Sequence, residues 1–276
     1  MADEVIDYDI ASVDATTLQV LKEPGRKPQT KSYVYCMRGG SPDRSVVLYG
    51  YNYEDHKVYV DKWFEGFKGY AHMDADQFFE TFTSDPDVKS SLCNAHARRK
   101  FESIVKLSPE PGLATGALKF YKKLYAIERR AKDEKLSPEE RYALRQKESK
   151  PIVEEFETWL DTNYPSVLPA SPLGQAFRYS MKHREGLRRF LEDGRLEIDN
   201  NLTEQQIKPF VIGRMFADSM DGAHALCLHF SLIRTAIAHH LNPYEYYVMI
   251  LKRIPYCKIV EDYEKLLPWN INKAPE

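Results

Sequence analysis

Short runs that mix β-branched, aromatic and polar residues fill the first part of the chain. They cover residues 10–14, 32–37 and 45–51, and their periodicity is that of strands. Turn-forming residues separate the runs, with a Pro-Gly pair at 24–25 and an Arg-Gly-Gly-Ser-Pro run at 38–42. The pattern predicts a meander of three antiparallel strands.

Helical and strand-like segments then alternate. Residues 53–67 predict a helix, residues 69–74 a further strand, and residues 75–82 a short helix. Residues 88–101 predict a strand that runs into a basic helix. Alternation of this kind indicates an α/β protein.

From residue 112 to 192 the apolar positions recur at helical spacing, which predicts an all-helical block. One helix is expected to begin at Ser137-Pro138, because serine is a good N-cap and proline suits the first helical turn. A mostly apolar stretch at 223–240 predicts a buried helix, and residues 263–270 look like a closing segment. The chain is therefore expected to have three parts: residues 1–110 as the first part of the core, 111–192 as a helical insertion, and 193–276 as the remainder of the core.

Composition narrows the class of protein. A chain of 276 residues with 43% hydrophobic and 29% charged residues is ordinary globular material. The formal net charge of −2 excludes attraction to polyanions by the whole-chain field, so any contact with nucleic acid must come from local basic patches. The four cysteines are scattered singly, which predicts reduced thiols. No signal peptide or membrane-spanning apolar run is visible, so we expect a soluble, cytoplasmic protein without a membrane partner.

Three separated acids are the candidate chemistry. Asp14 and Asp74 each close a strand-like run, and Glu204 lies at the start of a predicted helix. Two-metal phosphoryl transfer needs carboxylates from several elements. Each acid also has a local explanation, since Asp14 could cap a turn, Asp74 could N-cap a helix at 76, and Asn201 with Glu204 fits a capping box. Spacing alone favours these local roles for any one of the three.

A resemblance along nearly the whole chain changes that balance. It rests on ordered blocks: Asp14-x-Thr16 with Leu18-Gln19-Val20-Leu21, Phe67-Lys68-Gly69-Tyr70-x-x-x-Asp74, Cys93-x-Ala95-His96-Ala97-Arg98-Arg99-Lys100-Phe101, Gly194-Arg195-Leu196-Glu197-Ile198-Asp199-Asn200-Asn201-x-x-Glu204, Ser231-Leu232-Ile233-x-Thr235-Ala236 and Leu266-Leu267-Pro268-Trp269-Asn270. In these blocks the chain resembles the catalytic region of insertion sequence 66 family transposases. The third and fourth blocks are long enough to make coincidence a poor explanation.

The resemblance implies a DDE transposase with a ribonuclease-H-like α/β core, in which a mixed sheet is flanked by helices and interrupted by an all-helical insertion. By motif position the catalytic and metal-binding acids are Asp14, Asp74 and Glu204, with Asp199 as a rival for the third place. Two Mg²⁺ ions, for which Mn²⁺ would substitute, are implied as cofactors. They would promote hydrolysis of a phosphodiester at the element end and then attack of the freed 3′-hydroxyl on target DNA.

Basic residues near these blocks are candidates for DNA contact. The six candidates are His96, Arg98, Arg99, Lys100, Lys208 and Arg214. Further basic residues at 182–184 and 188–189 could extend a positive path. The alternative is that the basic triplet is a solvated helix face and that His96 packs against the sheet.

Several positions depart from the family pattern. They are Ala15, Ala75-Asp76, Asn94, Gln205 and Arg214-Met215-Phe216. Family members also carry DNA-recognition and oligomerisation segments ahead of the catalytic region, whereas Met1 stands close before Asp14 here. The expected partners are element ends and target DNA, further copies of the chain on DNA, and a DNA-binding protein that is encoded separately.

Three other functions remain open from the sequence. A truncated or degenerate remnant would bind DNA or a transposase partner without catalysis. A structure-recognising nuclease would use the same acids for hydrolysis without strand transfer. A zinc protein is the weakest alternative, because Cys93-x-x-His96 is only half a site.

Overall fold

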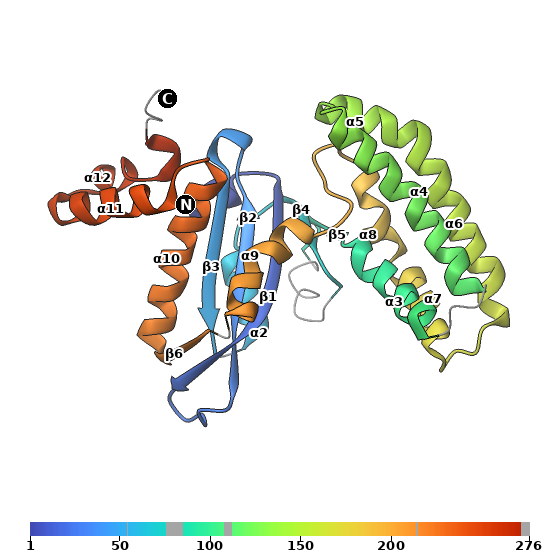
Figure 1. Cartoon of the computed structure of the whole chain (residues 1–276), viewed down its shortest axis with the longest axis horizontal. Helices are drawn as coiled ribbons and strands as arrows, with labels where there is room; N and C mark the ends of the chain where they lie inside the picture. Colours follow the sequence, from blue (N-terminus) through green and yellow to red (C-terminus); the bar gives the residue numbers. More distant parts are fainter. Residues whose placement is uncertain (54, 76–84, 108–111, 214, 272–276) are drawn as a thin grey trace. The chain divides into compact units, whose positions relative to one another are not determined.

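A computed structural model describes residues 1–53, 55–75, 85–107, 112–213 and 215–271 (Figure 1). Within these ranges six strands form one sheet in the order β3-β2-β1-β4-β5, and β6 pairs with β1. The strands are β1 (Ile10–Lys22), β2 (Lys31–Gly39), β3 (Val46–Asn52), β4 (Gly69–Met73), β5 (Val88–Leu92) and β6 (Phe216–Ser219). The β1–β2 and β2–β3 pairs are antiparallel and the β1–β6 pair is parallel, so the sheet is mixed.

The predicted meander is confirmed, since β1, β2 and β3 follow one another in the sheet as antiparallel neighbours. In the register Asp14 lies opposite Cys36, and Tyr35 lies opposite Gly50. Strand β1 has 13 residues and runs well beyond the predicted stretch at 10–14. The pairing with β6 was not predicted, because β6 has only four residues.

Helices account for most of the remaining described chain. The α-helices are α1 (Ala2–Ile6), α2 (His56–Trp63), α3 (Asn94–Leu107), α4 (Leu113–Asp133), α5 (Pro138–Leu144), α6 (Lys150–Asn163), α7 (Pro172–Lys182), α8 (Arg184–Arg188), α9 (Asn201–Ile212), α10 (Met220–Ala238), α11 (Pro243–Arg253) and α12 (Val260–Glu264). A π-helix, η4 (Arg145–Ser149), joins α5 to α6. Short 3-10 turns are η1 (Pro42–Arg44), η5 (Tyr164–Ser166), η6 (Arg189–Leu191), η7 (Ile254–Tyr256) and η8 (Pro268–Asn270).

The helices predicted at 53–67, after 88–92 and through 112–192 are confirmed by α2, α3 and the series from α4 to η6. The short helix predicted at 75–82 falls almost wholly outside the described residues, as does the proposed N-cap role of Asp74. No helix in the described chain is both long enough and apolar enough to cross a membrane. All four cysteines are free thiols, three of them buried.

The chain divides into two compact units. The first unit comprises the described parts of residues 1–71, 77–88 and 202–276, and the second comprises those of 72–76 and 89–201. The meander, α9, α10 and the C-terminal helices belong to the first unit, and α3 to α8 belong to the second. The three-part division at 110 and 192 stays a prediction.

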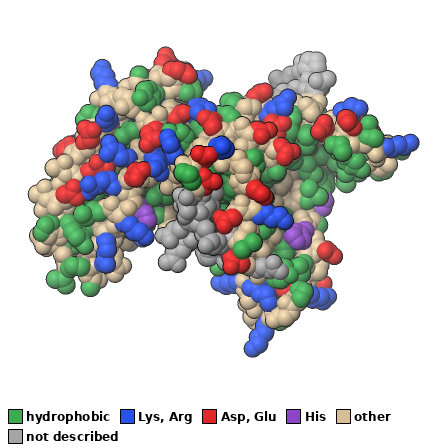
Figure 2. Space-filling model, turned by 180° about the vertical axis from the view of Figure 1, so that it is seen from behind, with side chains coloured by type: hydrophobic (Ala, Val, Ile, Leu, Met, Phe, Trp, Pro, Cys, Tyr) green, Lys and Arg blue, Asp and Glu red, His purple; other side chains and the backbone are tan. Residues whose placement is uncertain are grey.

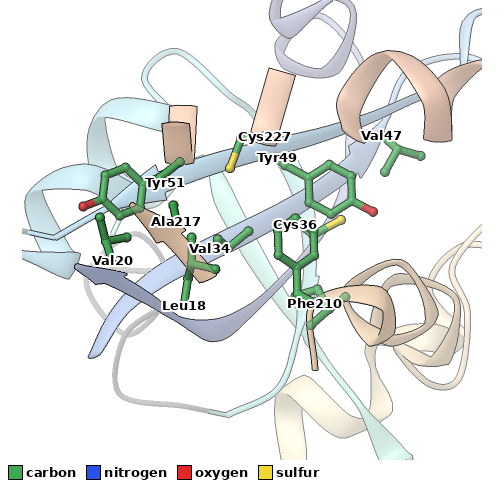
Figure 3. Close-up of a cluster of buried hydrophobic side chains, with 12 residues drawn as sticks. Leu18, Val20, Val34, Cys36, Val47, Tyr49, Tyr51, Phe210, Ala217 and Cys227 are labelled. Atoms are coloured by element: carbon green, nitrogen blue, oxygen red, sulfur yellow. The ribbon is translucent and has the colours of Figure 1, made fainter. Parts of the chain in front are cut away.

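One face of the sheet in the first unit carries its main core. Residues at alternate positions of β1, β2 and β3 pack there against α9 and α10, and Figure 3 shows this cluster. The buried members are Leu18, Val20, Val34, Cys36, Val47, Tyr49, Tyr51, Ile207, Phe210, Ala217, Ala223 and Cys227. Because β1 contributes Leu18 and Val20, the period of two places Thr16 and Asp14 on this same face.

Helix α2 covers the opposite face. The Tyr35 ring lies 5.1 Å from that of Tyr59 and 6.3 Å from that of Trp63, centroid to centroid. Gly50 permits this approach, because a Cβ atom there would stand 2.0 Å from the Tyr59 hydroxyl and 2.9 Å from the Trp63 ring. With helices on both faces, the middle of β2 is buried without alternation.

Helix α10 closes the β3 edge of the sheet with side-chain hydroxyls. The Val47 N–H donates to Thr235 Oγ1 at 3.0 Å, and that hydroxyl donates back to the Val47 carbonyl at 3.1 Å. The Tyr49 N–H donates to Ser231 Oγ at 2.8 Å. An edge strand otherwise leaves such groups unpaired, so Ser231 and Thr235 complete the sheet at this end.

The prediction of a buried helix at 223–240 was wrong for one side of α10. Ala223, Cys227 and Ala236 are buried, but Leu228 and Ile237 keep 58% and 40% of their surface exposed. Only the side that faces the sheet is covered, so hydrophobic composition exceeds what this unit buries. Figure 2 shows hydrophobic side chains gathered over the C-terminal helices at the right of the view.

The second unit has an aromatic core between α4, α6 and α7. Ring centroids lie 5.2 Å apart for Phe120 and Phe156 and 5.4 Å apart for Trp159 and Phe177. The predicted helix start at Ser137 is confirmed as a full capping box, in which Ser137 Oγ accepts the Glu140 N–H and Glu140 accepts the Ser137 N–H.

Candidate active site

Asp14 lies inside β1 rather than at a turn, so the turn-cap interpretation was wrong. Its Oδ1 accepts the N–H of Ala15 at 2.8 Å. Its partner across the ladder is Cys36, whose thiol is fully buried in the core cluster. Burial raises the pKa of this thiol, while the charge of Arg38 opposes the rise and the charge of Asp14 adds to it. Asp14 thus sits half-buried on the sheet face that α9 covers.

Glu204 lies in the first turn of α9, in the same unit as Asp14. It precedes Ile207 by three residues, so the two side chains share one side of the helix. Ile207 and Phe210 pack into the core cluster on the Asp14 face of the sheet. The first unit therefore brings Asp14 and Glu204 onto facing elements. Because α9 begins at Asn201 itself, Asn201 is not the residue before the helix, as the capping-box interpretation required.

Asp74 follows the last residue of β4 and belongs to the second unit. Its Oδ2 lies 3.6 Å from Nε2 of His96, which is in the first turn of α3. The two strands that lead here are tied together, because the Cys93 N–H donates to the Met73 carbonyl at 2.9 Å. An acid and an imidazole therefore meet at the carboxyl ends of β4 and β5.

Tyr179 of α7 was missed by the sequence reading. Burial, and after it the charge of Asp74, raises the pKa of Tyr179 to about 12. The phenol therefore stays protonated at neutral pH. A tyrosine at helical spacing among apolar residues is typical of a core position, so the sequence held no signal for its nearness to an acid 105 residues earlier.

Asp199, the rival third acid, lies in the second unit on the loop that enters α9. Its Oδ1 accepts the Asn201 N–H at 3.2 Å. Burial and the charge of Asp199 together raise the pKa of Tyr125, which lies on α4. Asp199 thus has a local role beside the helical block.

The basic triplet lies on α3 and has partners of its own. Arg98 pairs with Glu102 at 2.8 Å and lies 5.1 Å from the centroid of the Tyr125 ring. Lys100 Nζ lies 4.4 Å from the centroid of the Tyr179 ring. Arg99 and Lys100 are exposed, so they present charge to solvent on the helix that begins beside Asp74.

The other basic candidates divide into two groups. Lys208 is exposed on α9, and Arg214 lies outside the described residues. In the helical block, Arg184 pairs with Asp161 at 2.5 Å, Arg188 with Glu157 at 3.4 Å, and Arg189 with Glu185. These pairs neutralise part of the positive path suggested for residues 182–189.

The acids of the candidate site are divided between the units. Asp14 and Glu204 belong to the first, whereas Asp74 and Asp199 belong to the second. Convergence of the three acids is accordingly a proposal rather than a property of either unit.

Two family models match the chain. The model described as "Transposase IS66 family" matches residues 1–225, and the model described as "IS66 C-terminal element" matches residues 231–269. The chain belongs to the IS66 transposase family. The resemblance predicted from the ordered blocks is thereby confirmed, and the second model covers α11, α12 and the C-terminal part of α10.

Three relatives of this IS66 family chain come from Sinorhizobium fredii, and all bear the name of uncharacterized proteins. The protein y4jD is 30% identical over 76% of the chain and 43% of its own length. The proteins y4hP and y4qI are 29% and 30% identical over 86% and 93% of the chain, and over 45% and 50% of their own lengths. The chain thus spans about half the length of the curated relatives it matches. No solved structure matches it significantly.

Close backbone contacts explain why glycine occupies two positions in the blocks that resemble the IS66 family. Gly69 adopts a φ of +127°, and a Cβ atom there would stand 2.2 Å from the Asp9 carbonyl oxygen. A Cβ atom on Gly194 would stand 1.8 Å from the carbonyl oxygen of Pro138. Side chains are therefore excluded at the start of β4 and at the start of the loop that leads to Glu204.

Proposed function

We propose that this chain is the catalytic region of a DDE transposase that cleaves a DNA phosphodiester and joins the freed strand to target DNA. Asp14, Asp74 and Glu204 are the proposed catalytic acids, with Asp199 as the rival for the third position. The observation that carries the proposal is the placement of Asp14 in β1, the middle strand of the order β3-β2-β1-β4-β5, on the sheet face that is covered by the helix carrying Glu204. Membership of a transposase family gives that placement its chemical meaning.

A ribonuclease-H-like core belongs to the same proposal. The strand order β3-β2-β1-β4-β5, with an antiparallel meander at one end, supports it. So does the position of Asp74 after β4, the strand that neighbours β1 in the sheet. The helices α4 to α8 then form the proposed insertion before the last acid.

Carboxylates fit the proposed metal pair. Mg²⁺ prefers oxygen ligands and is held in proteins through a few carboxylates together with substrate phosphate oxygens. Asp14 is held by the Ala15 N–H, so one oxygen has a fixed direction on the sheet face. Two Mg²⁺ ions, or Mn²⁺ in their place, would supply charge stabilisation for the attacking and leaving oxygens.

His96 and several exposed basic residues would contact the DNA. The His96 imidazole beside Asp74 can donate to a phosphate oxygen or orient the carboxylate. Exposed Arg99 and Lys100 would hold the flanking backbone, and Lys208 would do so from α9. On the face seen in Figure 2, basic and acidic side chains are interspersed, so DNA binding would depend on such local groups. Further copies of the chain and a separately encoded DNA-binding protein are proposed partners.

The test is metal-dependent cleavage and joining of element-end DNA by the chain and its Asp74→Asn variant. Loss of a ligand to a catalytic metal should lower the rate by at least about 100-fold, because the metal contributes several kcal/mol to transition-state stabilisation. Asp218→Asn is the matched control, since Asp218 is 63% exposed and pairs only with exposed Lys22 among the ion pairs of the described chain. Unchanged activity in Asp74→Asn would refute the proposal.

The products separate the other functions. Joined strands indicate a transposase, whereas cleavage without joining at any DNA concentration indicates a nuclease on the same acids. An intact chain that binds DNA but shows neither cleavage nor Mn²⁺ binding is the degenerate remnant.

A further inference from the structure

The largest fully buried side chain of the described residues is an arginine, Arg145. Its five N–H groups all donate. Nε and Nη2 bind the two oxygens of Glu128 at 2.8 and 2.7 Å, and Nη2 also binds the Leu196 carbonyl at 2.8 Å. Nη1 binds the carbonyls of Phe190 and Asp193 at 2.7 and 2.9 Å. Arg145 thus joins α4 to one backbone carbonyl of η6 and two of the loop that precedes α9.

Neighbouring side chains hold the same loop. Arg141 binds Glu128 at 2.7 Å and makes two hydrogen bonds to the Glu197 carboxylate at 3.1 and 3.0 Å. Gln146 Nε2 donates to the Leu191 carbonyl at 2.7 Å. Helix α5 and η4 therefore hold the segment from 190 to 197 at several points, all within the second unit.

The far end of the loop is attached to the β5–α3 junction. The Asn94 N–H donates to the Ile198 carbonyl at 3.1 Å, and the Asn200 N–H donates to Cys93 Sγ at 3.1 Å. The backbone N–H of Cys93 in turn donates to the carbonyl of Met73, the residue before Asp74. The segment 193–200 is consequently fixed between the helical block and the strand ends that carry the second acid.

Stability alone does not account for this arrangement. Buried ion networks are weak stabilisers, since well-packed apolar residues of similar volume often serve as well or better. Arg145 also opens a π-helix, a form that is rare and is found frequently at functional sites. A guanidinium is suited to this place because its planar fork satisfies a carboxylate and several carbonyls at once.

We propose that Arg145 and Arg141 are positioning residues for the third acid of the catalytic site. They act through the segment 193–200, which carries Asp199 and continues directly into the first turn of α9, where Glu204 lies. The helical block thereby holds the segment of chain that leads to that acid. This inference rests on the proposed transposase function.

The experiment uses the full chain and three variants: Arg145→Lys, Glu197→Gln and the control Arg130→Gln. Lysine keeps the buried charge but cannot reach the three carbonyls as a fork. Glu197 is 45% exposed, and its change to glutamine removes the negative charge and one of the two oxygens that accept from Arg141 at the rim of the network. Arg130 pairs instead with Glu148, at 2.6 Å on the surface of the same block.

We expect the single-turnover cleavage rate to fall about 10- to 100-fold in Arg145→Lys and by less in Glu197→Gln, as for other groups that orient a metal ligand. The DNA concentration at half-saturation should stay unchanged, and Arg130→Gln should match the wild type. A wild-type rate in Arg145→Lys would overturn the proposal. So would a fall in rate that Arg130→Gln shares, because that points to general stability.

Hydrogen exchange of backbone amides separates this proposal from the proposed function. In Arg145→Lys, protection should fall for residues 194–200 while α4 and α6 keep theirs. If the wild type has no activity but this confined loss is seen, the proposed function fails and the holding of the loop stands. If protection falls throughout the second unit or nowhere, the positioning role fails, even when the wild type is active.

Discussion

Single residues decide how the loop before α9 is held. Arg145 binds Leu196 and Arg141 binds Glu197, some fifty residues later in the chain, and both arginines bind Glu128. From the sequence, charges at these positions suggest a solvated helix face, because nothing in the spacing tells which acid a basic residue will meet. The capping box at Ser137 was predictable because it is local. The buried network was not, because it depends on tertiary packing.

Gly194→Ala is predicted to destabilise the second unit by at least about 2 kcal/mol. The added methyl group would stand 1.8 Å from the Pro138 carbonyl oxygen, so backbone must shift on one side. Urea unfolding followed by fluorescence measures the change. Gly222→Ala is the control, since a Cβ atom there would make ordinary van der Waals contacts, with Ser219 Oγ at 3.5 Å and Ala217 Cβ at 3.9 Å. Equal effects of the two changes would contradict the steric explanation.

The ionisation of Glu128 should make the free energy of unfolding depend on pH in the acidic range. Burial by itself would raise the pKa of Glu128, but the hydrogen bonds and charges of Arg145 and Arg141 outweigh it and hold that pKa below its usual value. A carboxyl with a lowered folded-state pKa contributes stability that is complete above its unfolded pKa, about 4.3, and is lost as pH falls through the folded value. The free energy of unfolding should therefore decrease below about pH 4.3.

In Arg145→Met the main partner of Glu128 is gone, so burial counts for more and the pKa of Glu128 rises. The loss of unfolding free energy between pH 7 and pH 3.5 should become smaller than in the wild type. Urea titrations at the two pH values measure it. Arg130→Met, which leaves Glu128 untouched, should retain the wild-type pH dependence. An identical pH dependence in both variants would refute the assigned role of Glu128.

At the scale of elements, strong local patterns were predicted well. The meander, α2, α3 and the helical block follow from alternation, helical spacing and turn residues. Strand β6 and the extent of β1 were missed because their pairing joins Gln19 to Phe216, far apart in the chain. The exposed side of α10 was missed for another reason, since apolar composition does not tell whether a helix has one covering partner or two.

The contact between α10 and β3 gives a prediction at this scale. Thr235→Val removes the hydroxyl that both accepts from and donates to Val47, and it should cost about 1–3 kcal/mol because buried backbone groups lose their partner. Thr162→Val is the control, as its hydroxyl binds the Thr158 carbonyl on an exposed helix face. If unfolding titrations give the same loss of unfolding free energy for both variants, the contact at the sheet edge does not stabilise the protein more than an exposed hydroxyl contact does.

For the whole molecule, the net charge of −2 limits how DNA can be bound. The family identity followed from ordered blocks, whereas the placement of the acids in two units did not follow from any pattern.

Lys100 of α3 is predicted to make one phosphate contact. Lys100→Gln should then weaken binding and reduce the slope of log affinity against log salt by about 1.

Fluorescence anisotropy of labelled DNA at a series of salt concentrations measures that slope. Lys123→Gln is a matched control, since Lys123 is 57% exposed on α4 and lies 5.6 Å from the Phe120 ring. A slope that changes equally in both variants would indicate a general effect of charge rather than a contact at Lys100.

The hydrogen bonds of Ser231 and Thr235 to β3 also have a consequence for synthesis at the ribosome. Thr235 is synthesised 188 residues after Val47, so the Val47 backbone groups lack this partner until then. At about 5–20 residues per second, the delay is on the order of ten seconds or more. Throughout that interval the nascent meander has an open strand edge that could pair with another emerging chain. We therefore expect chains released before residue 231 to aggregate more readily than full-length ones, and a chaperone that shields strand edges to raise the yield of soluble protein.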